Sequence, residues 1–278
     1  MPHSARRRAH VTWALAAAAL VTESAAYTAT ATRPTPLAPD YVDGWAVTPK
    51  RSVWQGRELM CLVVSDDPSV DNLHSVAHPD HPRYRAFEEL EDPHGALGVW
   101  PSAYAACASL QKIASELKRP PTVLELGCGA GLPSLYASVV LESPRVVATD
   151  VEAVPLAFLE AARSAHVETG SFATCTLDVT YAAVDDIRGF DVVVCADMLY
   201  NTDVATALGA LLGAAACGAG APEFVVCDPG RRGRDHFLDA FGAASGLSPM
   251  FVDQAVPDGC VDVFDGTPIG AVGVLAAR

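Results

Sequence analysis

The sequence lacks the features that mark several large classes of protein. None of its eight cysteines belongs to a Cys-x-x-Cys pair, so neither a zinc cage nor a dithiol redox site is indicated. Its N-terminal apolar stretch, residues 11–21, is too short to cross a bilayer as a helix. Basic residues are scarce, with 19 Lys and Arg against 33 Asp and Glu and a formal net charge of −14. A surface this acidic repels phosphate backbones, which disfavours a nucleic-acid-binding role.

The few basic residues are also unevenly placed. Four of the 19 lie in the first 33 residues, which contain one acidic residue, Glu23. The remaining body has 15 basic against 32 acidic residues, a net charge of −17. A basic start, a short apolar core and a Thr- and Ala-rich tail predict that residues 1–33 are a targeting segment, either a secretory signal core or an Arg-rich organellar presequence. The predicted location is a mitochondrion or a plastid, including a plastid with extra surrounding membranes. The alternative is the cytoplasm, with this segment a disordered tail.

Cysteine and histidine usage points to packing rather than to metal binding. A chain of 278 residues can bury a core without disulfides or metals. Three cysteines lie in or beside short apolar runs and are expected to be buried in strands, in a reducing compartment: Cys175, Cys195 and Cys227. Three histidines lie in the proline-interrupted stretch 66–93, which gives them no fixed face, so no metal site is predicted: His74, His78 and His81.

Composition divides the rest of the chain into an N-terminal extension, 34–94, and a main domain, 95–278. Residues 34–40 are a Pro-rich linker. Trp45, Trp54 and the apolar run 59–64 predict a small β-rich lobe, and 66–93 is expected to be a loop.

The main domain alternates short apolar runs with helical patterns. A helix is expected over 102–118, because apolar residues recur there at helical spacing and two prolines follow. Further helices are expected near 132–141, 153–167, 203–217 and 234–244, strands at 122–126, 145–149, 171–177, 190–196 and 223–227, and a final strand pair at 247–254 and 268–277. Alternation of this kind predicts an α/β fold with a doubly wound, mostly parallel sheet.

A glycine-rich loop follows the first strand of this domain. Gly127, Gly129 and Gly131 form a G-x-G-x-G pattern. A dinucleotide fingerprint needs its third glycine at the position of Leu132, and a P-loop needs Gly-Lys-Ser/Thr, so binding of NAD or ATP is not predicted. The loop is instead expected to carry the backbone past another ligand, with the amides of the next helix close by. The alternative is a loop that serves only tight packing between strand and helix.

An acidic residue lies at or near the end of every predicted parallel strand: Glu125, Asp150, Asp178, Asp197 and Asp228. Ligands bind outside the carboxyl ends of such strands. Asp150 follows Gly129 by 21 residues, where a carboxylate can accept from ribose hydroxyls, and Glu152 is the second candidate. Asp178 is placed to accept from an adenine amino group. Helix capping explains one or two such acids, whereas five in register favour a ligand site.

The motif Leu-Glu-Leu-Gly-Cys-Gly-Ala-Gly-Leu-Pro at 124–133 resembles the first motif of class I S-adenosylmethionine-dependent methyltransferases. The segment Gly-Val-Trp-Pro at 98–101 and the pair Asp197-x-x-Tyr200 resemble the seven-strand protein-lysine methyltransferases of the methyltransferase-like group. Asp-Pro-Gly-Arg at 228–231 and Asp-Pro-His at 92–94 look most like the branch that modifies the electron-transfer flavoprotein β-subunit. The resemblance covers about 90–245, and Val179 stands where much of the group has Trp.

This resemblance implies a seven-stranded Rossmann-like fold, S-adenosylmethionine as cofactor and an exposed lysine of a protein as acceptor. It implies that Asp197 holds the acceptor amine and that Tyr200 shapes the slot around it. The implied cofactor-binding residues are Trp100, Glu125, Gly127, Cys128, Gly129, Gly131, Asp150, Glu152, Asp178 and Ala196.

Two other functions stay open. A small-molecule N- or O-methyltransferase can use the same scaffold, since fold does not fix substrate. A cofactor-binding partner protein without activity is the alternative from another class. Methylation of nucleic acid is disfavoured by the acidic body and by the absence of an Asn/Asp-Pro-Pro-Tyr/Phe/Trp motif.

Overall fold

The computed structural model describes residues 41–42, 45–65, 95–166, 170–218, 220–261 and 266–277. The chain from Thr35 to Arg278 forms one unit. The predicted targeting segment 1–33, the linker 34–40 and the loop 66–93 with its three histidines lie outside the described residues.

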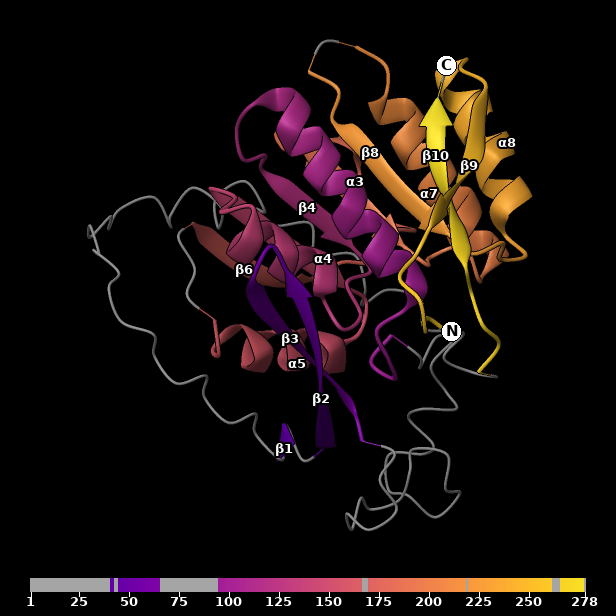
Figure 1. Cartoon of the computed structure of the whole chain (residues 1–278). Helices are drawn as coiled ribbons and strands as arrows, with labels where there is room; N and C mark the ends of the chain where they lie inside the picture. Colours follow the sequence, from indigo (N-terminus) through magenta and orange to yellow (C-terminus); the bar gives the residue numbers. More distant parts are fainter. Residues whose placement is uncertain are drawn as a thin grey trace, which may run out of the picture. The chain divides into compact units, whose positions relative to one another are not determined.

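The central element is a sheet of seven strands (Figure 1). The strands are β4 (Val123–Leu126), β5 (Arg145–Asp150), β6 (Ser171–Thr176), β7 (Val192–Ala196), β8 (Glu223–Asp228), β9 (Pro249–Ala255) and β10 (Ala271–Ala277), in the order β6-β5-β4-β7-β8-β10-β9. The first five in this order are parallel, and β10 is antiparallel to both β8 and β9. This confirms the predicted α/β class with a doubly wound, mostly parallel sheet. Strand order reverses between β4 and β7, which is where such sheets bind ligands.

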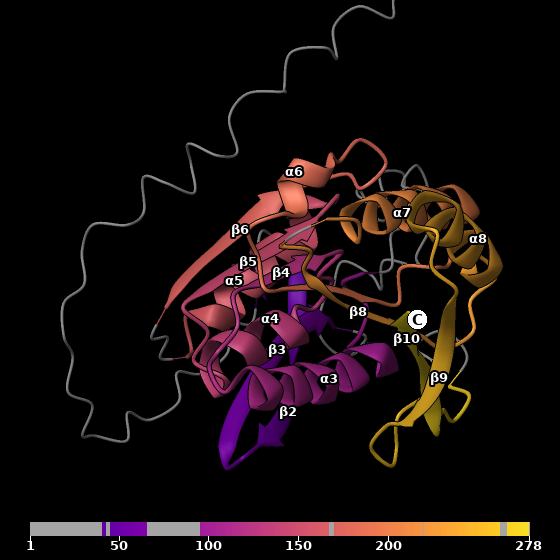
Figure 2. The same ribbon diagram turned by 90° about the horizontal axis from the view of Figure 1, so that it is seen from above.

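Helices cover both faces of the sheet (Figure 2). Those on one face are α3 (Pro101–Leu117), α4 (Leu132–Leu135), η1 (Tyr136–Val140) and α5 (Ala153–Arg163), and those on the other are α6 (Val184–Ile187), α7 (Thr202–Ala215) and α8 (Arg234–Ser245). Alternate residues of one strand serve the two faces: Val192 and Val194 join one buried cluster, whereas Val193 and Cys195 join the other. Burial on both faces explains why these strands are continuous apolar runs in the sequence.

The structure corrects three details of the predicted helices. The single helix expected over 132–141 is a short α-helix followed by the π-helix η1, in which the Leu141 N–H donates to the Tyr136 carbonyl. Every residue of both elements is buried, so the apolar run carries no periodicity that could separate the two forms. Helix α5 ends at Arg163 rather than near 167, and the four-residue α6 was not predicted.

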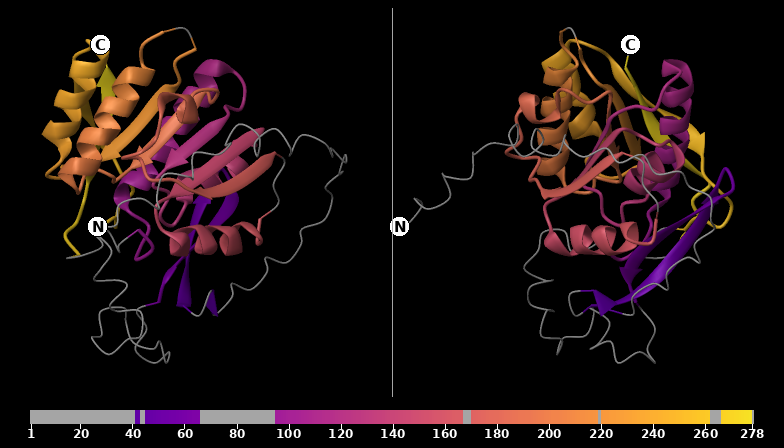
Figure 3. Two further views of the ribbon diagram at one scale, coloured as in Figure 1. Left: turned by 180° about the vertical axis from the view of Figure 1, so that it is seen from behind. Right: turned by 90° about the vertical axis from the view of Figure 1, so that its left-hand side faces the viewer.

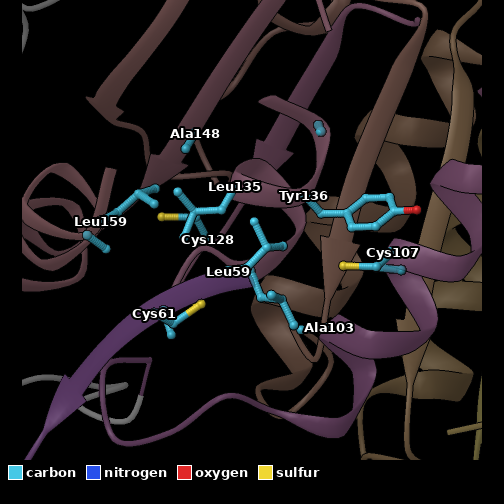
Figure 4. Packing of buried hydrophobic residues seen from close by; sticks show 14 of the residues in the cluster. Leu59, Cys61, Ala103, Cys107, Cys128, Leu135, Tyr136, Ala148 and Leu159 are labelled. Atoms are coloured by element: carbon cyan, nitrogen blue, oxygen red, sulfur yellow. The ribbon is translucent and has the colours of Figure 1, made fainter. Parts of the chain in front are cut away.

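The described part of the N-terminal extension is a small antiparallel sheet of β1 (Tyr41–Val42), β2 (Trp45–Trp54) and β3 (Arg57–Val64). The last six residues of β3 are buried, because this strand packs on α4, η1 and α5, on the outside of the helical layer (Figure 3). Trp54 anchors the hairpin against Tyr104 and Tyr136, with ring centroids 6.4 and 4.9 Å away. Figure 4 shows that Leu59 and Cys61 of β3 share one core with Leu135 of α4.

All eight cysteines are free thiols. Cys195 and Cys227 are buried as predicted. The prediction for Cys175 is wrong: it is only half-buried, because β6 is an edge strand in which the four central residues are half-buried and the two end residues are exposed. Among the described residues, no helix is long and apolar enough to cross a membrane, and no group of three or more His, Cys, Asp or Glu side chains could hold a metal ion.

His166 is expected to make the stability of the protein depend on pH. Its Nε2 accepts a hydrogen bond from the Met60 N–H of β3, with 3.2 Å between the two nitrogens, which requires a neutral ring. Burial lowers the pKa of His166, with a smaller opposing effect of the Met60 backbone. The unfolded chain therefore takes up a proton on His166 more readily than the folded chain does. The stabilisation by neutral His166 is fully present above the unfolded pKa of about 6.5 and is lost as pH falls through the lower folded pKa.

We expect His166→Gln to flatten this loss of stability on acidification, measured as the free energy of urea unfolding between pH 8 and pH 5. His236→Gln, a change at an exposed position of α8, is the control and should keep the wild-type slope. An unchanged slope in His166→Gln would show that the imidazole does not contribute.

Candidate active site

A cavity of about 350 Å³ lies at the carboxyl ends of the parallel strands. All twelve residues that the family resemblance implies for the site line it: Trp100, Glu125, Gly127, Cys128, Gly129, Gly131, Asp150, Glu152, Asp178, Ala196, Asp197 and Tyr200. They come from five separate stretches of chain, which the parallel sheet brings to one edge. The volume of the cavity is in the range of sites that bind small molecules.

The three glycines of the loop after β4 are needed for a reason that differs from the predicted one. All three have positive φ, of 65°, 50° and 72° for Gly127, Gly129 and Gly131. A Cβ atom at Gly129 would lie 2.6 Å from the Gly95 carbonyl oxygen, and one at Gly131 would lie 2.5 Å from Leu159. The space that a side chain would take is thus filled by the protein itself and not kept for a ligand. The glycines let the loop adopt its left-handed turns while three other segments, at Gly95, Leu159 and Met198, pack closely against it.

Glu125 joins β4 to α4, the helix that follows this loop. Its side chain is 1% exposed, and its Oε2 accepts hydrogen bonds from the Ser134 N–H, at 3.0 Å, and from the Ser134 hydroxyl. Burial raises the pKa of Glu125 to about 8, although the hydrogen bonds from Ser134 oppose this effect. Cys128 is also buried, and its side chain belongs to the core beside Leu135 and Ala148 (Figure 4).

We expect Glu125→Gln to be tolerated and Glu125→Ala to be destabilising. A glutamine carbonyl oxygen can still accept from Ser134, whereas alanine leaves buried donors unsatisfied at a cost of about 1–3 kcal/mol. Because the folded pKa is raised, wild-type stability falls as pH rises from the unfolded value of about 4.3 toward 8. The glutamine variant lacks this loss and should gain on the wild type at alkaline pH. Urea unfolding at pH 6 and pH 9 measures both effects. A Glu125→Ala variant as stable as the wild type would contradict the first, and a Glu125→Gln variant that does not gain on the wild type at pH 9 would contradict the second.

Asp150 and Glu152 stand at the end of β5. Asp150 is 8% exposed; its Oδ2 accepts from the Gly129 N–H at 2.9 Å and its Oδ1 from the Glu152 N–H at 3.1 Å. The carboxylate therefore ties the glycine loop to the second strand as well as lining the cavity. Glu152 is half-buried and precedes α5.

Asp178 shapes the turn after β6. Its Oδ1 accepts from both the N–H and the hydroxyl of Thr180, at 2.9 and 2.6 Å. Val179 and Tyr181 both line the cavity, but Val179 is buried, whereas Tyr181 is 78% exposed. The sequence did not single out this tyrosine, although an aromatic residue three positions after a strand-end acid is a signal that could have found it.

Asp197 combines a left-handed backbone with a carboxylate that is paired with an arginine. Its φ of 62° is left-handed, which is rare for a residue other than glycine and clusters at functional sites. It does not cap the next helix, since Asn201 accepts from the first amides of α7. Its carboxylate is instead paired through both oxygens with Arg231, at 2.7 and 3.0 Å. Tyr200 lies three residues on, is half-buried, and lines the cavity.

Asp228 does not belong to the cavity lining, which corrects its prediction as a site acid. It is fully buried and accepts from the backbone of Gly230 and Arg231 and from the side chain of Arg234, so it shapes the loop after β8. The ligand-facing residue of this loop is Arg231, which the sequence pattern did not identify as a site residue.

The chemistry of the lining fits S-adenosylmethionine. Five carboxyl side chains reach the cavity, and the one basic side chain among its described lining residues, Arg231, is paired with Asp197. Such a lining suits a cationic nucleoside and provides acceptors for ribose hydroxyls. Asp150, Glu152 and Asp178 would hold the nucleoside, and Trp100 and the glycine loop would hold the amino-acid part. When bound, S-adenosylmethionine supplies a methyl group that is already activated for transfer.

Comparison with known proteins gives a family but no near relative. The profile of a family described as lysine methyltransferase matches residues 79–241. No curated protein matches the chain significantly. Among solved structures, a putative RNA methyltransferase from Pyrococcus horikoshii has 15% identity and a TM-score of 0.43, covering 61% of this chain and 79% of its own.

Magnesium protoporphyrin IX methyltransferase from Synechocystis, solved with bound SAH, has 14% identity and a TM-score of 0.45, covering 64% of this chain and 83% of its own. These scores are too low for either structure to indicate a substrate. The family match spans more than half of the chain and agrees with the observed sheet and glycine loop. The protein is thus a methyltransferase of Rossmann-like fold that uses S-adenosylmethionine, and it belongs to the lysine methyltransferase family.

Proposed function

We propose that the protein transfers methyl groups from S-adenosylmethionine to the side-chain amine of a lysine in a protein substrate. The observation that carries this proposal is the position of Asp197, a buried carboxylate in a left-handed conformation at the transfer end of the cavity. The family match supports the same acceptor.

Sheet order separates the two ends of the cavity. Asp178 and Asp150 follow β6 and β5, on one side of the glycine loop that follows β4. Asp197 follows β7, on the other side of that loop. With the nucleoside held by the first two carboxylates, the reacting end of the cofactor lies toward Asp197.

Two side chains would act on the acceptor. Asp197 accepts a hydrogen bond from the amine and directs its lone pair toward the methyl group, which is a positioning effect. Tyr200 also lines the cavity, and it narrows the space around an unbranched aliphatic stem while excluding water. The body charge of −17 favours encounter with a basic protein surface.

The test is incubation of the full chain with tritiated S-adenosylmethionine and a total protein extract, followed by mass spectrometry of labelled bands. The expected result is a labelled protein with the methyl on a lysine. Label confined to the low-mass fraction would replace the proposal with a small-molecule methyltransferase. Binding of S-adenosylhomocysteine without any transfer would replace it with an inactive cofactor-binding protein.

A further inference from the structure

Arg231 lies in the cavity between Asp197 and Trp100. Its Nε donates to Asp197 Oδ1 at 2.7 Å and its Nη2 to Oδ2 at 3.0 Å. Its Cζ lies 5.5 Å from the centroid of the Trp100 ring. The Arg231 side chain is 21% exposed and that of Asp197 is 4% exposed, so the pair is largely shielded from water. The planar guanidinium thus fixes the plane of the carboxylate and is itself backed by an indole ring.

The backbone that carries Arg231 is also fixed. Its N–H lies 3.1 and 3.2 Å from the two carboxylate oxygens of Asp228, a residue with no exposed surface. Asp228 also accepts from the Gly230 N–H at 2.9 Å and from Arg234 Nε at 2.6 Å. The buried acid at the end of β8 therefore holds the loop that presents the guanidinium to the acid at the end of β7.

The backbone and the carboxylate of Asp197 are held by different contacts. The left-handed backbone of Asp197 is anchored by its N–H, which donates to the Cys227 carbonyl at 2.9 Å, whereas its carboxylate is oriented by side-chain contacts. Two parallel hydrogen bonds to one guanidinium fix the plane of the carboxylate in a way that a single ammonium cannot. The positive charge also offsets that of the carboxylate. A compensated carboxylate attracts a protonated lysine less strongly, so it favours the neutral amine that can attack.

We propose that Arg231 is a positioning residue, which orients the Asp197 carboxylate toward the acceptor amine and acts on methyl transfer through Asp197. The inference rests on the proposed function, because Arg231 can act in this way only if Asp197 contacts the acceptor amine.

The chain offers a matched control pair at the opposite end of the same strand. Asp191 directly precedes β7, as Asp197 directly follows it, and it is paired through both oxygens with Arg119, at 2.8 and 2.6 Å. Arg119 and Asp191 do not line the cavity. Arg119→Ala therefore breaks an ion pair that also uses both carboxylate oxygens, next to the same strand, without touching the site.

The experiment compares Arg231→Ala, Arg231→Lys, Asp197→Asn, the double variant Arg231→Ala/Asp197→Asn and Arg119→Ala in the full chain. Methyl transfer from tritiated S-adenosylmethionine to one fixed protein extract gives the maximal rate and the KM for the cofactor, and calorimetry gives the Kd of S-adenosylhomocysteine.

Both Arg231 variants should lower the maximal rate by about 10²-fold, the cost of misplacing a reacting group by about 1 Å. The KM for S-adenosylmethionine and the Kd of S-adenosylhomocysteine should stay within a few fold of the wild-type values. The double variant should be no slower than the slower single variant, since both changes remove the same interaction. Arg119→Ala should transfer at the wild-type rate.

A wild-type rate in Arg231→Ala, full rescue by Arg231→Lys, or independent losses that multiply in the double variant would each overturn the inference and leave the proposed function intact. If Arg231→Ala does not fold, Arg231→Lys, which keeps the charge and the stem, decides the question. A wild-type protein that labels no lysine would overturn the proposed function, and this inference with it.

Discussion

Replacing Asp197 by asparagine is expected to lower kcat/KM for methyl transfer by about 10²-fold or more, the effect of losing one preorganised electrostatic group. Asparagine adopts the left-handed conformation readily, so the φ of 62° at this position is retained. The change removes the negative charge that pairs with Arg231 and the carboxylate oxygen that would accept from the amine. The Kd of S-adenosylhomocysteine, measured by calorimetry, should change only a few fold, since the change lies at the transfer end.

Asp203→Asn is the control for a simple loss of charge, because it removes one negative charge from an exposed position in the first turn of α7. It should leave both turnover and cofactor binding unchanged. Near-wild-type turnover in Asp197→Asn would remove the assigned role, whatever the acceptor proves to be.

Replacing Gly129 by alanine is expected to weaken S-adenosylhomocysteine binding by about tenfold or more and to lower stability by about 1–3 kcal/mol. The φ of 50° is unfavourable for alanine, and its Cβ would lie 2.6 Å from the Gly95 carbonyl oxygen. Relief of this contact must move the loop or the Gly95 segment, and both line the cavity. Calorimetry and urea unfolding measure the two effects.

Gly246→Ala separates strain from crowding. Gly246 ends α8 with a φ of 72°, but a Cβ there would meet no atom within 4 Å. It should lose some stability from the backbone alone and bind S-adenosylhomocysteine as the wild type does. Wild-type binding by Gly129→Ala would show that the close approach of Gly95 is not required for the site.

The sequence by itself determined the fold class and the edge of the sheet that holds the site. Continuous apolar runs such as 192–196 indicate burial on both faces, and burial of this kind arises almost only in parallel sheets covered by helices. The carboxyl ends of parallel strands meet at one edge, so strand pattern alone assigns residues far apart in the chain, such as Asp150 and Asp197, to one cavity. Where burial is complete, as over 132–140, the same signal could not separate an α-helix from a π-helix.

Only the tertiary structure decided what each side chain contacts. Five strand-end acids look alike in the sequence, yet Asp228 shapes a loop, Glu125 holds Ser134, and Asp197 pairs with Arg231. The glycines of the loop were expected to make room for a ligand, but Gly95 and Leu159 fill that room. Such contacts depend on distances of a few ångströms between segments that are far apart in the chain, which hydrophobic periodicity does not encode. Periodicity places the elements, whereas the partner of a polar group is set by how those elements pack.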